Sequence, residues 1–156
     1  MYRSLDDLAG DAAGFPLFGE RIEGRSYAVR PCAYAIVPDA RGQIVIVRTS
    51  EGVFLPGGGM DPGESPEQAA IRETREECAL EIRVSRVIAR ATNIVQAAEA
   101  AAGFEKRSTF VAGEQGASLD GPPEHAVLWV SPAEAISRIT RPAHAWAVEQ
   151  WVERRS

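Results

Sequence analysis

Three glutamates in the middle of the chain are spaced so that their carboxylates could act together. Glu73, Glu76 and Glu77 follow one another at intervals of three residues and then one. In an α-helix, at about 100° per residue, their side chains fall within an arc of roughly 100°. Carboxylates this close repel one another, but a divalent cation between them reverses the sign of the interaction. Because hard oxygen ligands suit Mg²⁺ or Mn²⁺, the stripe predicts a metal site.

The same stripe has a simpler interpretation as the solvated face of a helix. Glutamate is a good helix former, and Arg72 can pair with Glu76 at i,i+4. A different arc of the helix carries Ile71, Thr74 and Cys78, which can face the core. The stripe by itself therefore leaves both interpretations open, and the residues around it have to separate them.

A glycine-rich loop and a well-marked helix start precede the stripe. The three glycines at positions 57–59 allow the backbone to turn sharply and to approach a phosphate closely. Ser65 is a good N-cap, Pro66 suits the first helical position, and Gln68 completes a capping box. The pattern predicts a loop over residues 55–59, followed by a helix that ends at about Cys78.

The spacing resembles the Nudix box, which reads glycine, five residues, glutamate, seven residues, then Arg-Glu-aliphatic-any-Glu-Glu-any-Gly-aliphatic. Gly58 opens the box here, Glu64 follows after five residues, and residues 72–80 supply the closing run. The approach at residues 54–57 and the later segment 124–132 are also similar to the family. The resemblance covers roughly residues 27–139, which is most of the chain.

Two positions depart from the family pattern. Thr74 stands at an aliphatic position, where its methyl can pack but its hydroxyl needs a partner. Ala79 stands at the family glycine, where a left-handed residue would end the helix. Alanine in that conformation costs about 1 kcal/mol. Both departures concern local geometry and leave the predicted metal ligands in place.

The resemblance implies an α/β fold, namely an α/β/α sandwich in which a mixed sheet is flanked by helices and the box forms a loop-helix-loop. It implies a hydrolase that cleaves a diphosphate linkage in a nucleoside diphosphate linked to another moiety, with Mg²⁺ or Mn²⁺ as cofactor. The flanking motifs of the ADP-ribose, dinucleoside polyphosphate, coenzyme A and NADH classes are not found. A nucleoside triphosphate or an oxidised nucleotide is therefore the default substrate.

The resemblance also assigns roles to individual residues. Arg72 would orient the carboxylates in the catalytic centre and would not itself attack the substrate. Glu64 is either a metal ligand or a structural brace to the loop, and the brace is preferred here. The implied metal ligands are Glu73, Glu76, Glu77 and Gly58.

Hydrolysis also needs a base within hydrogen-bond reach of the attacking water. One candidate is a box glutamate, Glu76 or Glu73. The other is Glu124, outside the box and just before a predicted strand, although this residue can equally be a solvated loop residue after two prolines. The residues expected to bind substrate are Gly57, Gly58, Gly59 and Arg48.

Hydrophobic patterning and turn residues predict the remaining elements. Strands are expected over residues 27–37 and 43–48, joined by a turn at 38–42 as a hairpin. Ser131 opens a second helix by the same capping pattern, and residues 142–154 form a last helix. Strands mixed with helices, without regular alternation, predict a mixed sheet covered by helices. Further strands are expected over residues 81–92, 104–112 and 125–130.

Length and patterning bound the class of protein. The 156 residues suit one compact domain over 1–156, in which residues 1–24 are weakly patterned as loop or edge strand. No apolar run approaches membrane-spanning length, and the N-terminus carries no apolar signal region. These features favour a soluble cytoplasmic protein that does not contact the membrane.

The net charge and the few cysteines and histidines limit the kinds of partner and metal that we expect. The net charge of −5 argues against a broad nucleic-acid surface, and an acidic protein would bind anionic phosphates through a metal ion. The partner that the resemblance implies is a small nucleotide-like substrate. Cys32 and Cys78 are expected to be small buried hydrophobes. His125 and His144 are too few and too scattered for a zinc site.

Three other functions stay open. The first is a non-catalytic nucleotide sensor on the Nudix fold, which turnover would distinguish from an enzyme. The second is an interaction domain with a relic box, which metal binding would distinguish from both. Removal of RNA caps is the third, and the acidic balance weakens it. A homodimer is common in the family, and nothing in the sequence requires one.

Overall fold

The computed structural model describes residues 15–97 and 101–155. The expectation for residues 1–14 lies outside these ranges. In the described part of the N-terminal segment, β1 (Leu17–Phe18) is a two-residue edge strand that pairs in parallel with a later strand. None of the described helices is both long and apolar enough to cross a membrane.

A five-stranded mixed sheet forms the centre of the molecule, in the order β1-β6-β7-β2-β5. The two longest strands, β6 (Leu80–Gln96) and β7 (Ala102–Ser118), pair antiparallel along most of their length. β7 also runs parallel to β2 (Ser26–Ile36), which in turn pairs antiparallel with β5 (Gly57–Gly59). Strands β2, β5 and β7 of this sheet each contribute residues to the cavity described below.

A smaller antiparallel sheet has the order β4-β3-β8 and comprises β4 (Gly52–Phe54), β3 (Ile44–Thr49) and β8 (Ala126–Val130). The predicted hairpin between residues 27–37 and 43–48 is therefore wrong. The side chain of Asp39 shapes the connecting turn, but beyond the isolated bridge Pro38↔Ile44 the two strands diverge into different sheets. Each strand finds its partners through long-range core packing, which a local turn signal does not report.

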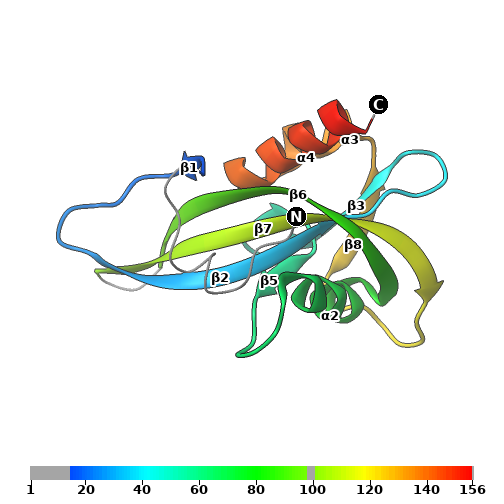
Figure 1. Cartoon of the computed structure of the whole chain (residues 1–156), viewed down its shortest axis with the longest axis horizontal. Coiled ribbons are helices and arrows are strands. Elements are labelled where there is room, and N and C mark those ends of the chain that lie inside the picture. The colour runs from blue at the N-terminus through cyan, green and yellow to red at the C-terminus, as the bar shows by residue number, and fades with distance from the viewer. Residues whose placement is uncertain (1–14, 98–100, 156) are drawn as a thin grey trace.

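Helices lie on both sides of the large sheet in the described part of the chain (Figure 1). α2 (Pro66–Cys78) lies on one face, and α3 (Pro132–Arg138) and α4 (Pro142–Arg154) lie toward the other. Successive side chains of β7 point to opposite faces of the sheet. Phe110 packs in the core under α4, and Val111 packs in the core under α2. The predicted sandwich of helix, mixed sheet and helix is confirmed.

The central strands run further than the sequence predicts. β6 and β7 extend past the expected limits of residues 92 and 112, through segments whose polar residues and glycines give weak strand signals. Each strand supplies the other's hydrogen-bond partners, and β6 adjusts its register at three irregularities. Pairing in the folded protein overrides the weak local preference there.

Residues 57–59, predicted as loop, form strand β5 against β2. Gly57 has φ 149°, and a Cβ there would stand 2.2 Å from the carbonyl oxygen of Ala33. Only glycine lets the two backbones approach this closely. Glycine commonly indicates a turn in a sequence, but here it allows two strands to lie close together.

The ends of α2 are as predicted. The hydroxyl of Ser65 accepts a hydrogen bond from the backbone N–H of Gln68, whose side chain accepts from the backbone N–H of Ser65. At the other end, Ala79 adopts the left-handed conformation with φ 53° and ψ 42°, and its N–H donates to the carbonyl of Arg75. Alanine thus carries the strain that the family glycine would avoid.

Candidate active site

The site begins where the loop before α2 returns to the large sheet. The backbone N–H of Leu55 donates to Nδ1 of His144, a buried residue of α4, over 3.2 Å. Burial holds the pKa of His144 well below its usual range, and the charges of Arg141 and Lys106 lower it further. The imidazole is therefore neutral at pH 7 and can accept this hydrogen bond. The bond connects the segment just before β5 to α4.

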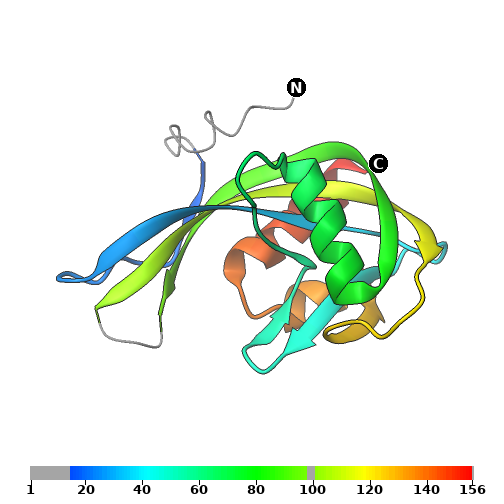
Figure 2. The ribbon, with the colours of Figure 1, turned by 90° about the horizontal axis from the view of Figure 1, so that it is seen from below.

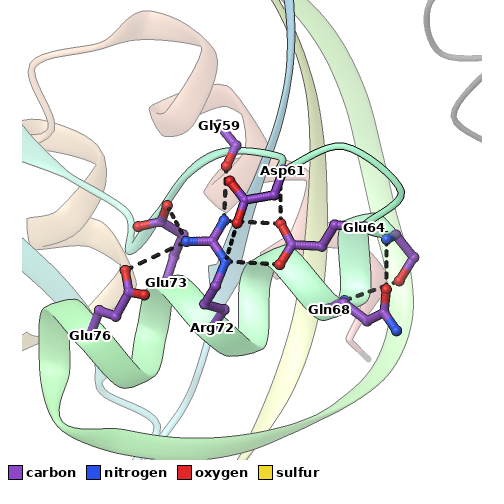
Figure 3. A network of polar contacts seen from close by, with 8 residues as sticks. Gly59, Asp61, Glu64, Gln68, Arg72, Glu73 and Glu76 are labelled. Carbon is purple, nitrogen blue, oxygen red and sulfur yellow. Dashed lines mark hydrogen bonds and ion pairs between the residues drawn. The ribbon is translucent and has the colours of Figure 1, made fainter.

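Arg72 connects the loop to the acidic face of α2 (Figure 3). Its guanidinium donates to both carboxylate oxygens of Glu64, at 2.8 and 2.9 Å, and to the carbonyl oxygen of Gly59 at 3.1 Å. The same group donates to Glu73 at 3.1 Å and reaches Glu76 at 3.5 Å. Asp61 also pairs with the guanidinium, at 3.4 Å, so the planar group links one loop carbonyl and four carboxylates in a fixed arrangement.

Glu77 is not among the carboxylates that Arg72 contacts and is nearly buried, with 9% of its surface exposed. Its Oε1 accepts a hydrogen bond of 2.7 Å from the backbone N–H of Gly57. The pKa of Glu77 is raised to about 7, mainly by burial, although the hydrogen bond from Gly57 lowers it. The negative charges of Glu73, Glu124 and Glu76 also raise this pKa. The carboxylate lies in a position where its own charge is poorly compensated by the protein.

The loop between β7 and β8 brings a fourth carboxylate and a histidine to the same place. The backbone N–H of Glu124 donates to the carbonyl oxygen of Glu76 over 3.2 Å, which docks the loop on the last turn of α2. Next to it, Nε2 of His125 lies 3.4 Å from Oε2 of Glu77. Sequence analysis considered His125 only as a zinc ligand, and its position beside Glu77 depends on this long-range docking.

The donors present fit a divalent cation. Burial raises the pKa of Glu73, and the negative charges of Glu76 and Glu124 raise it further. The charge and hydrogen bond of Arg72 lower this pKa. A cation among these oxygen donors would offset the repulsion between them. Over residues 15–97 and 101–155, no three such side chains already form a ligand set, and Arg72 engages Glu73 and Glu76 instead.

Gly58 stands directly against the carboxylate of Glu73. A Cβ at this position would lie 3.0 Å from Oε1 of Glu73, so a larger residue would push into the carboxylate. In Figure 2, β5 and the loop that follows it run beside α2. Gly58 and Glu73, predicted together as metal ligands, therefore lie side by side.

A cavity of about 340 Å³ opens beside Glu77. Gly57 and Gly58 line it, whereas Gly59 and Arg48 do not. Arg48 lies on β3 with its side chain exposed, so its predicted contact with substrate gains no support from the cavity. Residues that sequence analysis did not single out also line it: Tyr34, Phe54, Lys106 and Arg141.

Comparison with solved structures shows the same fold in several proteins. The ORF135 protein of E. coli has a TM-score of 0.62 at 24% identity, covering 83% of this chain and 93% of its own. The MutT protein of Methanosarcina mazei Go1 has a TM-score of 0.62 at 21% identity, covering 87% and 100%. Dihydroneopterin triphosphate pyrophosphohydrolase of E. coli has a TM-score of 0.58 at 16% identity, covering 83% and 99%.

Sequence comparison gives the family directly. No curated protein matches the chain. The family model of the NUDIX domain matches residues 28–153, which include the glycine strand, α2 with its carboxylates, and the loop of Glu124. The match extends over most of the chain, and the chain belongs to the NUDIX domain family.

Proposed function

We propose that this protein, a Nudix-type pyrophosphohydrolase, cleaves a diphosphate linkage in a nucleoside diphosphate linked to another moiety, with Mg²⁺ or Mn²⁺ as cofactor. The observation that carries the proposal is the convergence of four carboxylates, from α2 and from the β7–β8 loop, next to a cavity that begins at Gly57 and Gly58. Such a cluster is repulsive without a cation and attractive with one.

The residues divide into three tasks. Glu73, Glu76 and Glu77, together with Gly58, would hold the metal. When bound, the ion would neutralise the diphosphate and polarise the phosphorus–oxygen bond that breaks. Arg72 holds Glu73 and Glu76 in place and is itself held by Glu64, so Glu64 acts as the brace.

The proton of the attacking water needs an acceptor at the same place. Glu124 is our preferred base, because its loop is docked on α2 and its charge acts on both Glu73 and Glu77. A box glutamate, Glu76 or Glu73, is the alternative. Both assignments keep proton transfer on side chains of the carboxylate cluster.

We infer that the substrate is a small, diffusible nucleotide, with a nucleoside triphosphate or an oxidised nucleotide as the default. The cavity volume of about 340 Å³ is at the small end of the range for ligand pockets. We further propose that the chain acts in the cytoplasm as one domain over residues 1–156. A homodimer and the lack of a broad nucleic-acid surface stay predictions.

The test is a hydrolysis screen of the purified protein against nucleoside triphosphates, oxidised nucleotides, nucleoside diphosphate sugars and dinucleotides. Released phosphate is measured with Mg²⁺, with Mn²⁺ and with a chelator. We expect turnover of at least one class with either metal, none in chelator, and recovery on adding the metal back. Full activity in chelator would overturn the metal assignment.

The screen also separates the enzyme from a sensor. Calorimetry with Mg²⁺ and with each nucleotide accompanies the assay. Nucleotide binding without turnover of any compound would favour the non-catalytic sensor, and absence of metal binding would favour an interaction domain.

A further inference from the structure

The cavity beside Glu77 extends away from the carboxylates along the large sheet. Gly57 pairs with Tyr34, and Tyr34 pairs with Phe110 on β7. Lys106, which also lines the cavity, precedes Phe110 by four residues and points to the same side of the strand. At the usual rise of a strand, its backbone lies roughly 13 Å from the row that contains Gly57. The cavity thus reaches past the row of Gly57 to a residue further along β7.

Two cations line this distant part of the cavity. Lys106 comes from β7, and Arg141 is the residue that precedes α4. The guanidinium of Arg141 lies over the ring of Phe54, 4.9 Å from its centroid, and does not cap its own helix through a hydrogen bond. Both side chains are half-buried. Two elements far apart in sequence therefore place two positive charges at one site.

Neither cation has a counterion in the part of the chain that the structure describes. Most other buried or half-buried charges do, as in the contacts of Arg72 with Glu64 and of Arg107 with Glu105. Glu51 borders the same cavity but makes no ion pair with Lys106 or Arg141 among the described residues. Two partly desolvated like charges without a partner are unfavourable unless an anion joins them.

The electrostatic environment of Lys106 agrees with this geometry. Burial lowers the pKa of Lys106, and the neighbouring charges of Arg141 and Arg30 lower it further, against weaker opposing effects of Cys32 and Glu51. A bound anion would act in the opposite direction and favour the charged ammonium. An anionic ligand would therefore stabilise the charged form of Lys106.

A buried amide lies beside Lys106. Asn93 of β6 is the direct cross-strand partner of Lys106, and its side chain is 5% exposed. Its side chain makes no hydrogen bond with another described residue, and its polar atoms are not among the fully buried unpaired ones. Asn93 lines a second cavity of about 290 Å³, which shares Phe54 and Arg141 with the first. The side chain of Asn93 is therefore available to a ligand where the two cavities share residues.

We propose that Lys106 and Arg141, with Asn93 as a further hydrogen-bond donor, form a subsite for a phosphate group of the substrate other than the two of the diphosphate held at the carboxylates. The inference rests on the proposed function and narrows its substrate class. Substrates that carry an additional phosphate beyond the scissile linkage are preferred. That phosphate is either the third phosphate of a nucleoside triphosphate or a phosphate on a sugar, and the chemistry of recognition is the same.

The first experiment compares matched substrates. One pair is a nucleoside triphosphate and the diphosphate of the same nucleoside, and the other is NADPH and NADH, which differ by one sugar phosphate. We expect the parent protein to favour the phosphate-bearing member of at least one pair. Lys106→Gln and Arg141→Gln should each lower kcat/KM for that member about ten- to a hundredfold, mainly through KM. Values for the member without the phosphate should change about threefold or less, and Lys106→Arg should keep the preference.

Which pair responds identifies the source of the phosphate. The matched control is Arg41→Gln, because Arg41 is an exposed cation in the turn before β3 and lines neither cavity. An equal loss for both members of each pair, or the same loss in Arg41→Gln, would overturn the proposal.

The second experiment does not depend on hydrolysis. Binding of inorganic pyrophosphate is measured by calorimetry in chelator, where the carboxylates repel the anion and hold no metal. We expect the parent and Glu77→Gln to bind it, and Lys106→Gln and Arg141→Gln to bind it at least about tenfold more weakly. Absence of binding by the parent overturns the subsite whatever the screen shows. Binding that depends on Lys106 supports it even if no nucleotide in the screen is hydrolysed.

Discussion

The guanidinium of Arg72 donates two hydrogen bonds to the carboxylate of Glu64, at 2.8 and 2.9 Å, across eight residues of sequence. The carboxylate of Glu64 also accepts from the backbone N–H of Asp61, within the loop itself. The pair thus joins the loop to α2, and the Arg72 hydrogen bonds lower the pKa of Glu64 despite its partial burial. Positioning of Glu73 and Glu76 depends on this pair through Arg72.

Glu64→Gln should destabilise the protein, because an amide offers one acceptor atom where the carboxylate offers two and carries no charge. We expect the free energy of unfolding to fall by about 1–3 kcal/mol, the usual range for hydrogen bonds to charged groups. Urea denaturation measures it. The matched control is Glu81→Gln, whose pair with Arg75 is also bidentate but far more exposed, and there about 0–1 kcal/mol is expected. Equal small losses in both variants would contradict a bracing role for Glu64.

Glu77→Gln should separate stability from catalysis. An amide oxygen can still accept from the N–H of Gly57, and the poorly compensated charge is removed, so the melting temperature should stay constant or rise. Turnover should fall by at least about a hundredfold, because several kcal/mol of transition-state stabilisation can depend on a metal ligand. Glu149→Gln on the exposed side of α4 serves as control and should change neither quantity. Near-normal turnover in Glu77→Gln would count decisively against the ligand assignment.

Glu124→Gln tests the base. If Glu124 takes the proton, turnover should fall about a hundredfold or more, while the affinity for Mg²⁺ measured by calorimetry stays within a small factor. Glu76→Gln should instead weaken Mg²⁺ binding as well as turnover. If Glu124→Gln keeps turnover within a few-fold of the parent, the role returns to the box glutamates.

Ala79→Gly should stabilise the protein, since glycine adopts the observed left-handed conformation without steric cost. We expect a gain of about 0.5–1 kcal/mol in the free energy of unfolding, after allowing for the greater entropy that glycine loses on folding. Ala133→Gly, at an exposed position in the ordinary helix α3, is the control and should lower the stability by up to about 1 kcal/mol. A loss in both variants would mean that Ala79 carries no strain.

The parts of this protein that depend on local interactions could be predicted from the amino-acid sequence. The start of α2 at Ser65 and Pro66 and the left-handed end at Ala79 involve residues three or four positions apart. The interactions are made within one turn of helix, so they are readable before the rest of the chain is placed. The same regularity allowed the spacing of the carboxylates to predict the family.

The different surroundings of the three box glutamates could not be predicted from the sequence. Glu73, Glu76 and Glu77 share one arc in the sequence, but Glu77 is buried against Gly57 while Arg72 binds the other two. The difference arises because β5 packs beside one edge of the arc, a contact between segments about 20 residues apart. Helical periodicity contains no information about what lies next to each side of a helix.

The tertiary structure also decided how the strands pair and what surrounds the cavity. A turn at Asp39 suggested a hairpin, yet burial on both sides of β2 and β3 directs the two strands into different sheets. Lys106 and Arg141 carry no motif and lie 35 positions apart, so nothing local connects them. They meet because α4 packs across β6 while Lys106 lies on the neighbouring strand β7, and such long-range packing is set by the whole core rather than by any short segment.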